Sequence, residues 1–256
     1  MTAIDTLLTA LGSGDVGVVD LTAPLSSETP ILQLPTPFAN TIPLSLEPLS
    51  AYDDAGPAWR WSNIHTGEHT GTHVDAPVHW VSGRDGHSVD QIPPARLLGP
   101  AVVVDFTAET AADPDFLLEP EHLDAHVAEH GPLPEGCWLL FRTGWSSRGQ
   151  DAAAFANADH SGPHTPGVSP AGAQWLAASS MSGFGVETVG IDAGQAGGMD
   201  PAFPVHYFLL GADKYGLTQL RNLDRLPRAG AMVVVSPLPI VGGSGSPARA
   251  FALVPR

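Results

Sequence analysis

The sequence predicts an α/β or α+β layered fold, in which buried strands and helices form separate layers of one domain. Three observations support this class. Short runs rich in Val, Ile and Leu recur along the chain, as buried strands require. Segments with helix-capping signals lie between several of these runs. The two element types do not alternate regularly, which disfavours a doubly wound sheet of repeated βαβ units.

The predicted elements can be placed by their residue ranges. Buried strands are expected at 16–21, 101–106, 137–141, 186–192, 232–235 and 251–254. Helices are expected at 4–11, at 119–130 with Pro120 near the start, and after the cap formed by Ser169 and Pro170. A further pattern of this kind runs from 205–210 into 215–220 and ends within 222–227. Residues 27–52 and 144–168 fit neither type, so each is predicted to be a functional cover, a partner-contacting arm or a surface excursion without a role.

Length and composition predict one domain over residues 1–256. A hydrophobic fraction of 43% is enough for a sizeable core, while 28 Gly and 25 Pro indicate many turns and long loops. Loops of this kind commonly carry binding sites.

The charge balance argues against several classes of partner. Only eleven Lys and Arg and a formal net charge of −16 disfavour binding to a nucleic-acid backbone or to an anionic membrane surface. Residues 1–11 contain no basic region and no long apolar run, and no later segment approaches the ~20 apolar residues of a membrane helix. We therefore expect no nucleic-acid partner, no membrane partner and a cytoplasmic location. The single cysteine, Cys137, fits a reducing compartment.

The most informative segment, residues 69–79, reads His-Thr-Gly-Thr-His-Val-Asp-Ala-Pro-Val-His. Gly71 and Pro77 disfavour a helix, so the segment is predicted to be extended or irregular. Alternate side chains of a strand share one face. If this segment were a strand, one face would carry the side chains of His69, His73, Asp75 and His79.

Imidazole and carboxylate side chains in this segment indicate a metal site. Neutral imidazole and carboxylate form the ligand set that Zn²⁺, Mn²⁺ and Fe²⁺ accept. Neighbouring same-face Cα atoms stand roughly 6.5 Å apart, so His73 and Asp75 can converge on one ion if the chain bends. His79 would more easily reach a group bound to that ion. A single histidine is more often a satisfied core or surface residue, and His65 and His87 are expected to be loop residues or to support the ligands.

The segment resembles the HxGTHxDxPxH signature of the cyclase family of metal-dependent hydrolases, which includes bacterial kynurenine formamidase and isatin hydrolase. Further similarity at 190–193, 205–211, 222–227 and 237–242 extends it over most of the chain. The resemblance implies a layered β/β/α fold with a mixed sheet, and homo-oligomers, here expected to be a homodimer or a homotetramer. It also implies one divalent metal ion per subunit, held by His69, His73 and Asp75, with His79 as the catalytic acid/base.

One departure from the formamidase pattern favours the isatin hydrolase branch of the family. The formamidase branch has a metal-binding glutamate soon after a histidine like His206, whereas residues 207–220 contain no Glu. The isatin hydrolase branch uses a glutamine as its late ligand, and Gln219 resembles it. A neutral amide in place of a carboxylate leaves one more positive charge on the site, which makes the ion a stronger Lewis acid. Oxygen donors beside two imidazoles favour octahedral Mn²⁺, with Zn²⁺ as the alternative.

The predicted reaction is hydrolysis of a C–N amide bond in a small aromatic cyclic amide, an isatin-like lactam opened to an isatinate-like product by metal-activated water. His79 would shuttle the proton from water to nitrogen. His206 is expected to contact the substrate, to serve a second proton step or to pack at the start of an apolar helix. The alternatives are an arylformamidase acting on N-formylkynurenine, a polyketide cyclase or dehydratase using the same ion, and a non-catalytic protein with a structural ion.

Aromatic side chains near the segment are candidates for holding a flat substrate ring by stacking. Core packing is the alternative for each of them. The candidates are Trp80, Trp61, Trp59, Phe38 and Phe208.

Overall fold

The main sheet of the protein curves until its two ends meet, because its last strand pairs with three others. The structure is a computed structural model that describes residues 2–149 and 151–256. In this sheet β14 pairs with β13 along one side, and with β4 and then β1 along the other. The strands in spatial order are β1 (Val16–Asp20), β14 (Gly245–Pro255), β13 (Ala231–Pro237), β5 (Leu98–Asp105), β7 (Trp138–Arg142), β11 (Gly183–Val186), β12 (Tyr215–Leu217) and β4 (His73–Asp75).

The sheet is mixed, as predicted. β5, β7, β11 and β12 run parallel to one another, whereas β4, β14, β13 and β1 pair antiparallel with their neighbours. Side chains alternate between its two faces, so that Val103 joins one core cluster and its neighbour Val102 joins the other. The first cluster fills the concave side around Trp138 and Tyr215, and the second lies under the helices.

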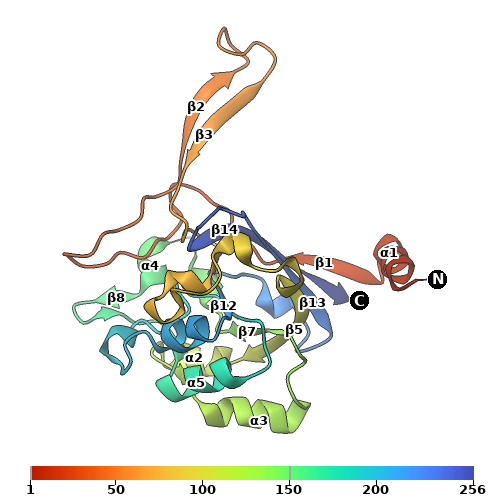
Figure 1. Ribbon diagram of the computed structural model, residues 1–256, viewed down its shortest axis with the longest axis vertical. Coiled ribbons are helices and arrows are strands. Elements are labelled where there is room, and N and C mark those ends of the chain that lie inside the picture. The colour runs from red at the N-terminus through yellow and green to blue at the C-terminus, as the bar shows by residue number, and fades with distance from the viewer. Residues whose placement is uncertain (1, 150) are drawn as a thin grey trace.

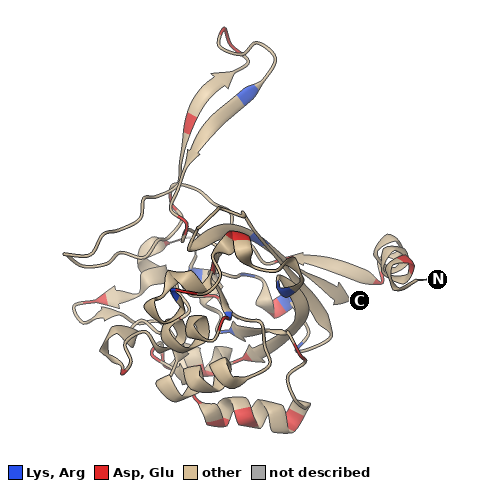
Figure 2. Cartoon of the chain, viewed as in Figure 1, with Lys and Arg blue, Asp and Glu red and all other residues tan. Residues whose placement is uncertain are grey.

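Three helices, α2, α3 and α5, lie together below the sheet in Figure 1, and α3 and α5 contribute Leu123, Ala173 and Leu176 to the second core cluster. Their bounds and those of the other helices are α1 (Ala3–Ser13), α2 (Thr107–Ala112), α3 (Pro120–His130), α4 (Ala152–Ala156), α5 (Pro170–Ala178) and a π-helical turn (His206–Leu210). The predicted start of α5 is confirmed, because the Ser169 hydroxyl accepts a hydrogen bond of 3.0 Å from the Gly172 amide. Acidic residues recur along α3 (Figure 2), which fits the negative net charge.

One strand prediction and one helix prediction are wrong. The strand predicted at 186–192 lies instead at Gly183–Val186, because a Cβ at Gly183 would stand 2.4 Å from the Trp138 ring and only glycine fits there. Residues 215–217 form β12, although the apolar pattern indicated a helix, because they pair with β11 and β4. The strands predicted at 16–21, 101–106, 137–141 and 232–235 are confirmed within a few residues, and the strand predicted at 251–254 is part of the longer β14.

The segment 27–52 contains half of a hairpin that the sequence did not indicate. β2 (Ser45–Ala51) pairs with β3 (Arg60–His65), and together they project from the body of the molecule (Figure 1). We call residues 45–65 the arm. Two other small pairings are β10 (Gly167–Val168) with β6 (Leu117–Leu118), and β8 (Ala158–Asp159) with β9 (Gly162–Pro163). Among the residues described, no helix has both the length and the apolar character needed to cross a bilayer.

Candidate metal centre

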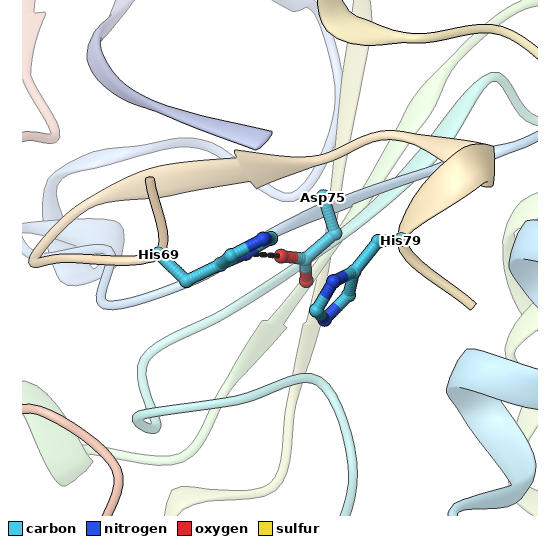
Figure 3. A group of neighbouring side chains, drawn as sticks. All are labelled: His69, Asp75 and His79. Atoms are coloured by element: carbon cyan, nitrogen blue, oxygen red, sulfur yellow. Dashed lines mark hydrogen bonds and ion pairs between the residues drawn. The ribbon is translucent and has the colours of Figure 1, made fainter. Parts of the chain in front are cut away.

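The metal-site segment is extended over only three residues. β4 ends at Asp75, and a 3-10 turn at Pro77–His79 follows, with Pro77 in its first turn. The prediction that one continuous strand face carries all four side chains is therefore wrong. The turn instead brings His79 back toward Asp75, and Figure 3 shows the rings of His69 and His79 on either side of that carboxylate.

Two glycines on the neighbouring strands make room for Asp75. In register, Asp75 stands opposite Gly216 of β12 and Gly245 of β14. A Cβ at Gly216 would lie 2.7 Å from Asp75 Oδ2, and one at Gly245 would lie 2.5 Å from Cε1 of His69. Both strands therefore need glycine at the point where the buried carboxylate and the His69 ring pass between them.

Asp75 Oδ1 is the point at which two imidazoles converge. Nδ1 of His69 lies 2.8 Å from it, and Nε2 of His73 lies 3.3 Å from it. Asp75 is 1% exposed and His73 is 4% exposed, so water screens these contacts little. His69, Asp75 and His79 each offer one ligand atom, and these three atoms lie within 4.8 Å of one another.

The hydrogen bonds on the far side of each ring fix where its proton sits. Ser244 donates its hydroxyl hydrogen to Glu68 at 2.6 Å, so it must accept from Nε2–H of His69 at 2.9 Å. Nδ1 of His73 lies 2.7 Å from the carbonyl oxygen of Gly71, to which it must donate. Both remaining imidazole lone pairs therefore face the same carboxylate oxygen.

This arrangement calls for a cation. Lone pairs of two nitrogens and an oxygen repel one another unless positive charge lies between them, and a divalent ion supplies it with the ligand types that it prefers. Neighbouring ligands of an octahedral ion, at about 2.1 Å and at right angles, stand about 3 Å apart. The two nitrogen-to-oxygen distances, 2.8 and 3.3 Å, fall on either side of that spacing. The donor set therefore fits a metal ion.

The ionisation of the carboxylate is also suited to a ligand. Burial alone would raise the pKa of Asp75, but the adjacent imidazoles of His73 and His69 hold that pKa well below its ordinary value. Burial lowers the pKa of His79 to about 3, so this ring is neutral at pH 7. Its ring stacks on His69 with centroids 3.9 Å apart.

His206 completes the cluster from the π-helical turn. Its Nε2 lies 3.9 Å from Asp75 Oδ2, and its ring centroid lies 5.4 Å from that of His79. Asp192 accepts a hydrogen bond of 2.5 Å from Nδ1. Burial alone would lower the pKa of His206, but this carboxylate raises it above its ordinary value. Trp80 packs on the His206 ring at 4.8 Å and forms an aromatic wall with Phe203 at 5.6 Å.

The remaining predicted site residues are Gln219, Phe208, Trp61 and Phe38. Gln219 is 4% exposed and donates from Nε2 to the carbonyl of Pro30 at 3.0 Å, lining a cavity of about 180 Å³ with Glu187 and Arg221. Phe208 is partly buried and packs against the second core cluster. Trp61, 58% exposed, lies on the arm, and Phe38, 63% exposed, lies in the segment that precedes it.

Sequence reasoning missed three residues that orient the histidines. Glu68 precedes the first histidine directly, but a carboxylate at that place is common on surfaces. Ser244 comes from a flexible-looking glycine-rich stretch, and Asp192 from a segment predicted to be a strand. The similarity to the cyclase family at 190–193 was the one sequence signal for Asp192, and it indicated no function for this residue.

Several known proteins resemble this chain in sequence and in fold. The Cyclase family model, described as "Putative cyclase", matches residues 19–193. The isatin hydrolase of Roseibium aggregatum is 47% identical over 99% of this chain and 98% of its own length, and a kynurenine formamidase of Bordetella avium is 29% identical over 90% and 95%. A solved isatin hydrolase bound to the product analogue thioisatinate superposes with a TM-score of 0.97, at 46% identity, over 100% of both chains. The chain therefore belongs to the cyclase family of metal-dependent hydrolases.

Proposed function

We propose that this protein hydrolyses the C–N amide bond of a small aromatic cyclic amide, opening an isatin-like lactam to an isatinate-like product. The observation that carries the proposal is the convergence of two imidazole lone pairs on Asp75 Oδ1 beside two further histidines. The substrate class follows from the full-length similarity to proteins named isatin hydrolase. The departure from the formamidase pattern after His206 supports the same branch.

His69, His73 and Asp75 would hold the ion, with Mn²⁺ preferred and Zn²⁺ as the alternative. When bound, the ion would supply a Lewis acid that polarises a carbonyl and lowers the pKa of water. Glu68 with Ser244, and the carbonyl of Gly71, keep the two imidazoles in the tautomers that ligation needs. The resemblance suggests Gln219 as a further ligand, and since its Nε2 donates to the Pro30 carbonyl, Oε1 is the atom that would bind the ion.

The remaining side chains would carry out the proton transfer and hold the substrate. In the hydrolysis an oxygen of water bonds to the lactam carbon, the C–N bond breaks, and nitrogen gains a proton. His79 takes the proton from water and delivers it to nitrogen. His206 faces the same space from the opposite side of Asp75 and orients the substrate or serves a second proton step. Trp80 would stack on the flat ring of the substrate.

We also propose that the chain acts as a homodimer or a homotetramer in the cytoplasm. The arm exposes large apolar side chains, which water does not favour: Leu46, Leu49, Tyr52, Trp59, Trp61 and Ile64. An isolated two-stranded hairpin is marginally stable, so contact with another subunit would stabilise it. Because the arm projects from its own body, Trp61 would contact a substrate bound in a neighbouring subunit, and we propose the same for the exposed Phe38 in the segment before the arm. The free, buried Cys137 fits a reducing compartment.

A substrate assay tests the function. Protein stripped of metal by a chelator, and the same protein reloaded with Mn²⁺ or Zn²⁺, are offered isatin and N-formylkynurenine in parallel. We expect isatin to be consumed only by the reloaded protein, and faster than N-formylkynurenine. Faster turnover of N-formylkynurenine would favour the arylformamidase alternative, and no turnover of either would contradict hydrolysis of these amides.

A further inference from the structure

We propose that Asp192 is a positioning residue, which fixes the tautomer and the orientation of His206 so that its Nε2 lone pair faces the metal centre. The catalytic consequence of this role rests on the proposed function. The hydrogen bonds that support the role do not depend on the substrate. The role concerns the one histidine of the cluster that comes from a different part of the chain than residues 69–79.

The Asp192 carboxylate is anchored before it meets His206. Its Oδ1 accepts a hydrogen bond of 2.7 Å from the backbone amide of Val205, and its Oδ2 accepts one of 3.2 Å from the backbone amide of His206. Its side chain is 4% exposed. The amides at the start of the helical turn therefore hold the carboxylate in place, and the position of its oxygens does not depend on the imidazole.

The third hydrogen bond determines the proton position on the ring. Nδ1 of His206 lies 2.5 Å from Asp192 Oδ2. A buried carboxylate at this distance accepts and does not donate, so Nδ1 carries the hydrogen. The lone pair of a neutral His206 is then on Nε2, and that atom lies 3.9 Å from Asp75 Oδ2. Trp80 packs against the ring at 4.8 Å and opposes its rotation.

His79 is held in a different way. Its ring stacks on His69 and contacts Trp80 edge-on, and within the described residues its nitrogens make no hydrogen bond. Stacking fixes the plane of a ring but leaves both tautomers open. Of the two histidines beyond the proposed ligands, His206 is thus the one whose acceptor nitrogen is specified by its neighbours. A carboxylate that orients an imidazole in this way commonly supports proton transfer or substrate contact by the other nitrogen.

In the Asp192→Asn variant, the side chain at position 192 donates this hydrogen bond and Nδ1 of His206 accepts it. With the amide oxygen accepting from the Val205 backbone, the amide NH₂ stands in the place of Oδ2, where it gives up the bond from the His206 backbone amide, donates to Nδ1 and moves the ring hydrogen to Nε2. The nitrogen facing the centre then loses its lone pair. We expect kcat on isatin to fall by about 100-fold or more, the scale of a lost proton-transfer group, with KM changed by less than about threefold.

Histidine-selective ¹⁵N NMR of the zinc-loaded protein reads the tautomer directly, and His206→Gln assigns the signal. We expect the parent to carry its hydrogen on Nδ1 of His206 and the Asp192→Asn variant to carry it on Nε2. The matched control is Asp115→Asn, which alters another carboxylate bonded to a histidine Nδ1, that of His164 at 2.6 Å, outside the site. We expect this variant to keep the parental kcat.

Two results would overturn the inference. An Nε2–H tautomer of His206 in the parent contradicts it without any variant, which covers the case that Asp192→Asn fails to fold. A changed tautomer with a kcat within about threefold of the parent contradicts the positioning role. If the parent does not hydrolyse isatin, the proposed function fails, and the tautomer of the parent still decides whether Asp192 orients His206.

Discussion

The glycine opposite Asp75 on β12 offers a direct test of the metal centre. Gly216→Ala adds one methyl group, and its backbone does not adopt the left-handed conformation that disfavours alanine. The new Cβ would lie 2.7 Å from Asp75 Oδ2 and 3.0 Å from Cγ2 of Ile191. The substitution therefore acts on the carboxylate by steric contact alone.

The size of the effect follows from these distances. A relaxed carbon-to-oxygen contact is about 3.3 Å or more, so the carboxylate oxygen must move by about 0.6 Å from the 2.7 Å position. Metal sites tolerate ligand displacements of about 0.2 Å. We therefore expect metal affinity to fall by about 10-fold to 100-fold, or about 1.4 to 2.8 kcal/mol. Overpacking should also lower the free energy of unfolding of the metal-free protein by about 1 to 3 kcal/mol.

Calorimetric titration of chelator-stripped protein with Mn²⁺ measures the affinity, and urea unfolding measures the stability. Gly198→Ala is the matched control, because a Cβ there has no neighbour within 4 Å. Parental Mn²⁺ affinity in Gly216→Ala would refute the reasoning that Asp75 holds the ion between these strands. An equal loss in Gly198→Ala would show that the effect is not local.

Four further predictions concern single residues. His79→Ala should keep the parental metal content, measured by elemental analysis, while kcat on isatin falls by about 100-fold or more; loss of the metal would instead make His79 a ligand. Gln219→Ala should weaken Mn²⁺ binding in calorimetry, and an unchanged affinity would remove Gln219 from the ligand set. Hydrogen bonds to Asp115 and then Asp159 raise the pKa of His164, so the stability it contributes is complete below about pH 6.5 and is lost as pH rises through the raised pKa. Urea midpoints of His164→Gln should accordingly fall less between pH 5.5 and 8.5 than those of the parent, and an equal fall would contradict this linkage. Trp61→Ser should shift the molar mass from light scattering toward the monomer at low concentration, whereas an unchanged mass would exclude Trp61 from the subunit contact.

The sequence predicted the strands that carry a run of apolar residues. Val102, Val103 and Val104 of β5 form a continuous apolar run because both faces of the sheet are covered. β11 was misplaced because its sequence, Gly-Phe-Gly-Val, has low strand propensity, and its glycines are needed for packing against Trp138. The arm was missed because β2 carries a proline and its burial pattern is almost entirely exposed.

For the site, the sequence predicted the residues that lie within one segment and missed those that come from distant elements. Residues 69–79 supply a carboxylate and three histidines from one short segment, so their types and spacing indicated a metal centre. Ser244, Asp192 and Gly216 reach the centre from other elements, and no local pattern links them to it. The proton position on His69 depends on one such distant partner, Ser244, which is why the sequence could not predict it.

The pairing of β4 with β14 has a consequence for biosynthesis. Asp75 stands opposite Gly245, a residue made 170 positions later, so the backbone around the carboxylate cannot close on a nascent chain until Gly245 has been synthesised. Contacts this remote in sequence form late and slowly during folding. Metal capture is thus coupled to completion of the fold, and an interrupted translation product would lack a finished centre with which to take up the ion.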